Sequence, residues 1–155
     1  MSLLTTTVSY TDHKGKTSDV DFGDLLKNAE YTVLYFYPKD NTPGCTIEAR
    51  EFSTHLTQFQ KVDAQVIGVS KDSSKSHCGF QEKQELTIGL ISDTDKALQG
   101  AFKAEGLKKF MGKEYIGTLR NTYLLDKSGK VLYKRENVTP LGHAKQVLEY
   151  IIDMK

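Results

Sequence analysis

Short apolar runs rich in β-branched and aromatic residues alternate with helical periodicity along this chain of 155 residues. The clearest runs are residues 32–37, 64–70 and 87–91. A strand with one face in water alternates polar and apolar residues, whereas these runs are apolar on both faces, as in strands covered on both sides. The pattern therefore predicts a layered α/β protein in which helices pack against a central sheet.

Helices and hairpins are predicted between and around these strands. Residues 43–60 place apolar side chains at steps of three and four, which is the spacing of a helix with one buried face. Further helices are predicted at residues 73–84, 95–102 and 139–154. Hairpins are predicted where residues 7–10 meet 18–21 and where residues 119–125 meet 130–135, each with glycine in the turn.

The order of these elements favours one fold class. Strand, helix, strand, helix and strand are followed by an antiparallel hairpin and a last helix, which predicts a central mixed β-sheet flanked by helices, with an N-terminal β-hairpin. A thioredoxin-like fold is the simplest fit, and the late hairpin argues against a doubly wound, flavodoxin-like alternative. The length suits a single domain over residues 1–155, since no linker or repeat divides the chain.

Charge and hydropathy exclude several classes of partner. The 21 Lys and Arg residues nearly balance the 20 Asp and Glu residues, so the net charge is +1 and no basic field for binding nucleic acid is expected. No apolar run approaches the ~18 residues of a membrane-spanning helix, and no signal segment opens the chain. We therefore expect a cytoplasmic protein with neither a membrane nor a nucleic acid as partner.

The cysteines and histidines do not form a metal-binding pattern. Cys45 and Cys78 are too far apart in sequence for a CxxC pair, and the four histidines are scattered without ligand spacing. The adjacent His77 and Cys78 lack the further ligands that a structural metal needs. No metal and no other cofactor are expected.

Cys45 lies where a helix is predicted to begin. Pro43 suits the first helical position, which makes Thr42 the N-cap and places Cys45 in the first turn. The free N–H groups and the dipole of that turn favour a thiolate. Four residues before Ala49, Cys45 falls on the stripe that faces the core, so a sheltered pocket is expected. On these local features alone, a reactive thiolate and a merely packed thiol are about equally supported.

Two separated segments resemble one family. Residues 36–46 read FYPKDNTPGCT and resemble the active-site motif of the peroxiredoxins, in particular the bacterioferritin-comigratory (PrxQ) subgroup. Residues 113–126 read KEYIGTLRNTYLLD and resemble a second region of that subgroup. The similarity extends from about residue 31 to the C-terminus.

The resemblance implies a thiol peroxidase that reduces hydrogen peroxide and organic hydroperoxides in antioxidant defence. Cys45 would be the peroxidatic cysteine, which attacks a peroxide oxygen and becomes a sulfenic acid. Thr42 would hydrogen-bond the thiolate and the peroxide, Arg120 would stabilise the negative charge, and Pro38 would shield the pocket. Glu48, one turn after the cysteine, is expected to have at most a minor role.

The resemblance also bears on the second cysteine. Many PrxQ members have a resolving cysteine five residues after the first, where this chain has Arg50. Other members use the next helix, which here contains Cys78, so a Cys45–Cys78 disulfide is expected within a monomer, reduced by thioredoxin or a similar dithiol. Such a bond needs Cα atoms within about 7 Å, so local unwinding is expected. A one-cysteine peroxidase with an incidental Cys78 is the alternative.

Other functions are less well supported. A thioredoxin-type oxidoreductase needs a CxxC pair, and a cysteine phosphatase resembles a Cys-x5-Arg loop, whereas four residues separate Cys45 from Arg50. A peroxide sensor or holdase that passes its oxidation to another protein remains open. A basic cluster is interpreted as a solvated loop rather than a nucleic-acid surface, and it consists of Lys103, Lys108, Lys109 and Lys113.

Overall fold

The computed structural model describes residues 3–154. The strands are β1 Thr7–Thr11, β2 Thr17–Asp21, β3 Tyr31–Phe36, β4 Ala64–Ser70, β5 Gly89–Ser92, β6 Glu105–Phe110, β7 Lys113–Thr118, β8 Thr122–Asp126 and β9 Val131–Arg135. The helices are the 3-10 turn η1 Leu3–Thr5 and the α-helices α1 Phe22–Leu26, α2 Pro43–Thr54, α3 Leu56–Lys61, α4 Ser74–Gln84, α5 Ala97–Ala101 and α6 His143–Met154. Within this described part of the chain, none of the helices is long and apolar enough to cross a membrane.

A seven-stranded mixed sheet in the order β2-β1-β5-β4-β3-β8-β9 forms the centre of the described chain. The three apolar runs seen in the sequence are its parallel strands β3, β4 and β5, while β1, β8 and β9 run antiparallel to their neighbours. The two predicted hairpins are present as β1–β2 and β8–β9, and they lie at the two edges of the sheet. Parallel strands in the middle need cover on both faces, which explains why they are apolar throughout.

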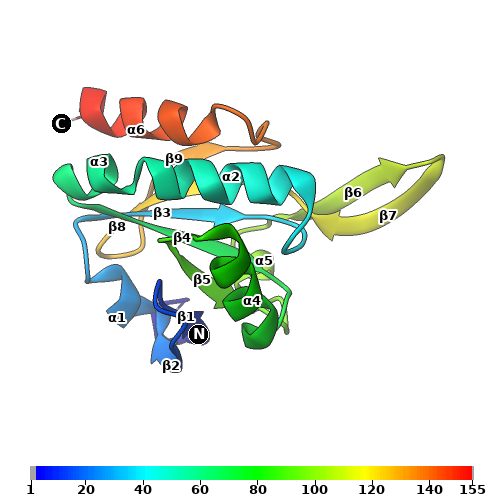
Figure 1. Ribbon diagram of the computed structural model, residues 1–155, viewed down its shortest axis with the longest axis horizontal. Coiled ribbons are helices and arrows are strands. Elements are labelled where there is room, and N and C mark those ends of the chain that lie inside the picture. The colour runs from blue at the N-terminus through cyan, green and yellow to red at the C-terminus, as the bar shows by residue number, and fades with distance from the viewer. Residues whose placement is uncertain (1–2, 155) are drawn as a thin grey trace.

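Alternate residues of the central strands feed two separate cores. Val33 and Tyr35 of β3 pack with residues from α2, α3, α4 and α6, whereas Leu34 and Phe36 pack with residues from α1 and α5. Three of the helices on the first face, α2, α3 and α6, run along the same side of the sheet (Figure 1). A short loop, residues 37–42, connects the carboxyl end of β3 to the start of α2, and the first core extends to this edge, where it includes Cys45.

The predicted helix over residues 43–60 is in fact two helices. The backbone leaves the helical region at His55, which ends α2 and begins α3. Phe52 before this break and Phe59 after it remain in one core, with ring centroids 5.9 Å apart. Because both helices keep an apolar face toward that core, the periodicity continues across the break and does not reveal it.

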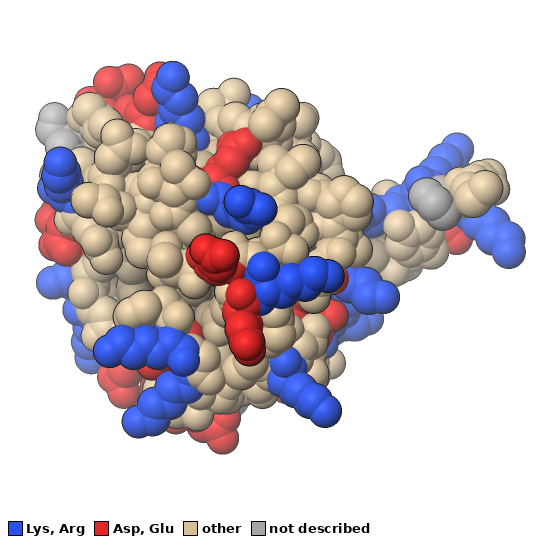
Figure 2. Space-filling view, in the orientation of Figure 1, with Lys and Arg blue, Asp and Glu red and all other residues tan. Residues whose placement is uncertain are grey.

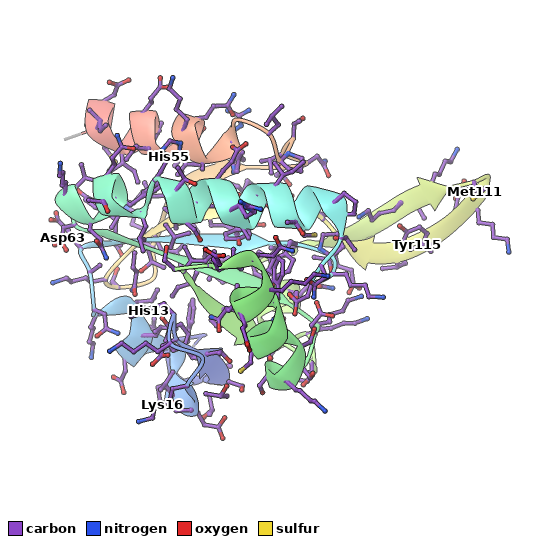
Figure 3. All side chains as sticks on the ribbon, viewed as in Figure 1. His13, Lys16, His55, Asp63, Met111 and Tyr115 are labelled. Atoms are coloured by element: carbon purple, nitrogen blue, oxygen red, sulfur yellow. The ribbon has the colours of Figure 1, made fainter. Side chains whose placement is uncertain are left out.

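The basic cluster is not a loop. Its residues lie in or beside a two-stranded ribbon, β6–β7, which turns at Met111 and Gly112 and projects from the body of the molecule (Figures 1 and 3). Both turn residues have positive φ, as in the type I′ turns that commonly connect two-residue hairpins. The prediction failed because a ribbon that stands away from the core has no buried face, so its residues show no apolar alternation.

His143 begins α6 on the same side of the sheet as α2. Its ring is buried, meets Phe52 edge-on at 6.0 Å, and places Nε2 2.7 Å from the Thr122 hydroxyl. Burial, with a further contribution from the charge of Arg135, lowers the pKa of His143 from 6.5 to about 4. The imidazole is therefore neutral in the folded protein at neutral pH.

This burial predicts acid-sensitive stability. Between pH 6.5 and about 4 the unfolded chain binds a proton at His143 that the folded chain does not, so the free energy of unfolding falls as the pH is lowered through this window. Urea unfolding of His143→Asn should show a shallower loss of stability below pH 6.5. The exposed His13→Gln is the matched control and should behave like wild type; a wild-type slope in His143→Asn would contradict the assignment.

Candidate active site

Cys45 lies in the first turn of α2, as predicted. Thr42 is the N-cap with an extended backbone, and Pro43 opens the helix. The Cys45 side chain is 1% exposed and belongs to the core that contains Tyr35, Ala49 and Phe52. The first-turn N–H groups of a helix lack intrahelical acceptors, so this sulfur is out of bulk water but beside the positive end of a helix.

Arg120 reaches this sulfur from a distant part of the sequence. Its Nη2 donates to Cys45 Sγ at 3.3 Å. The segment between β7 and β8 that contains Arg120 is held by two backbone hydrogen bonds, from Phe36 N to Asn121 O and from Val138 N to Arg120 O, both 2.8 Å. These bonds hold a full positive charge beside the buried sulfur of Cys45.

Gly44 makes room for this guanidinium. A Cβ at position 44 would lie 2.8 Å from Arg120 Nη2 and 3.4 Å from Pro140 Cγ, so the arginine crosses directly over the glycine backbone. Any larger residue at this position must displace the guanidinium. The helical backbone at position 44 would accept other residues, so glycine is needed here for its lack of a side chain.

Glu48 is the residue that the sequence analysis most underestimated. Three positions after Cys45 on the same face of α2, its side chain is fully buried, and Oε1 lies 3.5 Å from Arg120 Nη1. Burial raises the pKa of Glu48 from 4.5 to about 8, although Arg120 opposes that rise. At neutral pH the carboxyl is therefore protonated, and the charge of Arg120 remains available to Cys45. The signal in the sequence was a carboxylate on the apolar stripe of a helix.

The structure alters the expected contacts of Thr42. Its hydroxyl makes no capping bond to the helix and instead donates to the Lys39 carbonyl oxygen at 2.8 Å. No hydrogen bond from Thr42 to Cys45 is present. Pro38 is half-buried in the same loop, between the end of β3 and the start of α2.

Cys78 is not brought to Cys45. It lies in α4, half-buried, and its thiol donates to the Gly15 carbonyl oxygen at 3.3 Å. Gly15 belongs to the β1–β2 turn, whose neighbouring residues His13 and Lys16 are marked in Figure 3. Both cysteines are free thiols, and the two sulfur atoms contact different elements.

A second basic side chain lies near the site. Lys108 of the ribbon donates from Nζ to the Thr118 carbonyl oxygen at 3.0 Å. Its partial burial, and to a smaller extent the positive charge of Arg120, lower the pKa of Lys108. On the face shown in Figure 2, acidic and basic side chains are interspersed, and no continuous basic field is visible. Residues 3–154 contain no group of three or more His, Cys, Asp or Glu side chains arranged to hold a metal ion.

Gly44→Ala tests whether Arg120 activates the thiolate. Alanine is compatible with the helix, but its Cβ pushes the guanidinium away from Cys45. Because a hydrogen bond to a charged group contributes about 1.5–3 kcal/mol, alkylation of Cys45 by iodoacetamide should slow by about tenfold to a hundredfold. Gly100→Ala in α5 is the control, since a Cβ there meets nothing within 4 Å. Equal alkylation rates in the two variants would contradict the role of Arg120.

Glu48→Gln tests the buried acid. From pH 4.5 to about 8 the folded protein keeps the Glu48 proton and the unfolded chain releases it, so wild-type stability should fall by a few kcal/mol as the pH rises. The glutamine variant lacks this contribution, and its urea unfolding should depend less on pH over the same window. Glu149→Gln on the exposed side of α6 is the control. Parallel curves for Glu48→Gln and wild type would rule out a neutral Glu48.

Comparison with known proteins identifies the family. The AhpC/TSA family matches residues 5–134. The peroxiredoxin Bcp of Bacillus subtilis is 41% identical over 148 residues, which cover 96% of this chain and 85% of the relative. A Xylella fastidiosa PrxQ mutant superposes with a TM-score of 0.89 at 36% identity, covering 98% of this chain and 91% of that one.

A further structure concerns activity. This structure is of the bacterioferritin comigratory protein of Xanthomonas campestris and comes from work on its alkyl peroxide reduction activity. It superposes on this chain with a TM-score of 0.87 at 35% identity and covers 98% of this chain and 93% of that one. The thioredoxin-like fold predicted from the sequence is thus confirmed, and the motif resemblance agrees with relatives found over most of the chain. The chain belongs to the AhpC/TSA family of peroxiredoxins, within the Bcp/PrxQ subgroup, and is a thiol peroxidase.

Proposed function

We propose that Cys45 is the peroxidatic cysteine. In this proposal Arg120 stabilises the Cys45 thiolate and the negative charge that develops on the departing peroxide oxygen. The observation that carries this proposal is the 3.3 Å contact between Arg120 Nη2 and Cys45 Sγ at the first turn of α2. The thiolate attacks one peroxide oxygen, the O–O bond breaks, and the departing oxygen takes up a proton to become water or an alcohol. A fixed cation beside both atoms lowers the barrier because negative charge moves from sulfur to oxygen.

Thr42 and Pro38 complete the proposed pocket. Because the Thr42 hydroxyl hydrogen is donated to Lys39, its oxygen is free to accept a hydrogen bond from the peroxide O–H and so orient the substrate. Pro38, half-buried in the loop before the helix, restricts access of water to the sulfur. The substrates are hydrogen peroxide and organic hydroperoxides, and the alkyl peroxide activity reported for the Xanthomonas relative supports the second class.

Cys78 resolves the oxidised Cys45 in this proposal. The Cys78 sulfur attacks the sulfenic sulfur, an S–S bond forms as the S–O bond breaks, and the hydroxyl leaves with the thiol proton as water. A thioredoxin-type dithiol then reduces the disulfide by thiol exchange and leaves as a disulfide itself. The different partners of the two sulfur atoms imply that α4 must rearrange before they can bond.

The proposed enzyme acts as a monomer in the cytoplasm. Every residue of the proposed cycle comes from one chain, so no second copy is needed to complete the site. The cycle consumes dithiol reductant at each turn, and the cytosol is the compartment that keeps such thiols reduced.

Intact-mass spectrometry after one equivalent of hydrogen peroxide tests this cycle. Reduced wild type should lose two hydrogens within seconds and yield a peptide in which Cys45 is bonded to Cys78. Cys78→Ser should instead gain oxygen on Cys45, and Cys45→Ser should not react. With a thioredoxin system supplied, wild type should consume many equivalents of peroxide and Cys78→Ser few.

Each other outcome excludes one part of the proposal. Oxygen added to Cys45 in wild type would retain the peroxidase and remove Cys78 from the cycle. Disulfide formation without repeated turnover would favour a peroxide sensor. An unchanged mass would mean that Cys45 is not the reacting residue.

A further inference from the structure

A buried carboxylate joins the loop before Cys45 to the helix that contains Cys78. Asp40 is 4% exposed, and its two carboxyl oxygens take part in three hydrogen bonds. Oδ1 accepts from the Tyr37 hydroxyl at 2.6 Å, and Oδ2 accepts from the Ser76 hydroxyl at 2.8 Å. Oδ2 also lies 2.8 Å from His77 Nδ1, with which it shares a hydrogen bond. Two of the three partners therefore lie in the first turn of α4, just before Cys78.

Both ring nitrogens of His77 have hydrogen-bond partners, so the orientation of the ring is restricted. Its ring is fully buried, and its other nitrogen, Nε2, lies 2.9 Å from the carbonyl oxygen of Ile91 in β5. A carbonyl oxygen only accepts, so Nε2 must donate the hydrogen. The ring therefore spans from Asp40 to β5, and the residue next to Cys78 is held at both of its nitrogens.

These contacts oppose the movement that the proposed cycle needs. Cys78 now bonds to the β1–β2 turn, and moving its sulfur to Cys45 requires the start of α4 to unwind. Unwinding pulls Ser76 and His77 away from Asp40 and leaves its buried carboxyl group with Tyr37 as the remaining side-chain partner. Loss of hydrogen-bond partners at a buried carboxyl group is costly, so the unwound state is rare while the link is intact.

We propose that Asp40, Ser76 and His77 form a latch that sets how fast Cys78 is released to Cys45. They are positioning residues and do not touch the reacting atoms. The latch decides between two fates of the Cys45 sulfenic acid: attack by Cys78, which yields the disulfide, or reaction with a second peroxide, which adds another oxygen to sulfur and yields water or an alcohol. A stronger latch slows disulfide formation and makes the enzyme easier to over-oxidise.

Ser76→Ala is the sharpest test, because it removes one hydrogen bond from the latch and leaves the helix with a better helix former. Disulfide formation should become about three- to tenfold faster. Its rate is measured by quenching samples with an alkylating agent and recording their intact mass. The peroxide concentration that over-oxidises half of the enzyme should rise by the same factor. The rate at which peroxide first oxidises Cys45 should not change.

Two comparisons separate the latch from a general loosening of the fold. Ser74→Ala lies in the same turn of α4, has no hydrogen bond to Asp40, and makes the same change in helix propensity, so its disulfide formation should be no faster than that of wild type. Asp40→Asn keeps the side-chain shape but weakens both links to α4, and should accelerate disulfide formation at least as much as Ser76→Ala. Amide hydrogen exchange of the reduced protein should show faster exchange in α4 for Ser76→Ala than for Ser74→Ala.

The inference rests on the proposed resolving role of Cys78, and its failure can be distinguished from failure of that role. If wild type forms the Cys45–Cys78 disulfide but Ser76→Ala and Asp40→Asn form it no faster, the latch is refuted and the cycle stands. If no such disulfide forms in wild type, the resolving role fails and the latch with it. Equal acceleration in Ser74→Ala would also refute the latch, since that residue makes no contact with Asp40.

Discussion

The contact between Arg120 and Cys45 is the interaction on which the rest of this site depends. A thiol that is 1% exposed has lost nearly all its contact with water, and an anion there needs a compensating charge from the protein. The first turn of α2 contributes partial positive charge, and Arg120 contributes a full one at 3.3 Å. Gly44 allows the guanidinium to approach this closely, and Pro43 starts the helix where the sulfur can benefit.

The arginine is held in place by parts of the chain that carry no chemistry. Its segment is bonded to the end of β3 and to Val138, and Leu119 N donates to the Ala104 carbonyl oxygen at the base of the β6–β7 ribbon. Thr118 at the end of β7 donates to Gln99 of α5 at 2.6 Å. The ribbon exposes Leu107 and Ile116 at its surface, yet its base helps to hold the segment that contains Arg120. Residues 118–121, which include Arg120, are thus held by backbone and side-chain hydrogen bonds.

Two buried acids near the site have opposite surroundings. Glu48 has one oxygen without a hydrogen-bond partner, and burial raises its pKa to about 8, so it stays neutral beside Arg120. Asp40 has three hydrogen-bond partners and links two elements through its carboxyl group. The first arrangement preserves the positive charge of Arg120, and the second ties the loop before Cys45 to α4. In the proposed cycle, the two carboxyl groups therefore have separate roles, one beside the reacting sulfur and one at the helix of the second cysteine.

The sequence by itself determined the features that depend on local patterns. The apolar runs predicted the three parallel strands, the Thr-Pro-Gly-Cys order predicted the start of α2, and the motif resemblance indicated Arg120. Only the tertiary structure decided what depends on distant residues meeting: the guanidinium over Gly44, the neutral Glu48, and the link from Asp40 to His77. It also decided the break at His55 and the β6–β7 ribbon, since an unbroken periodicity hides the first and the lack of a buried face hides the second. A pKa or a buried hydrogen bond is a property of an environment, and that environment exists only once segments far apart in sequence have packed together.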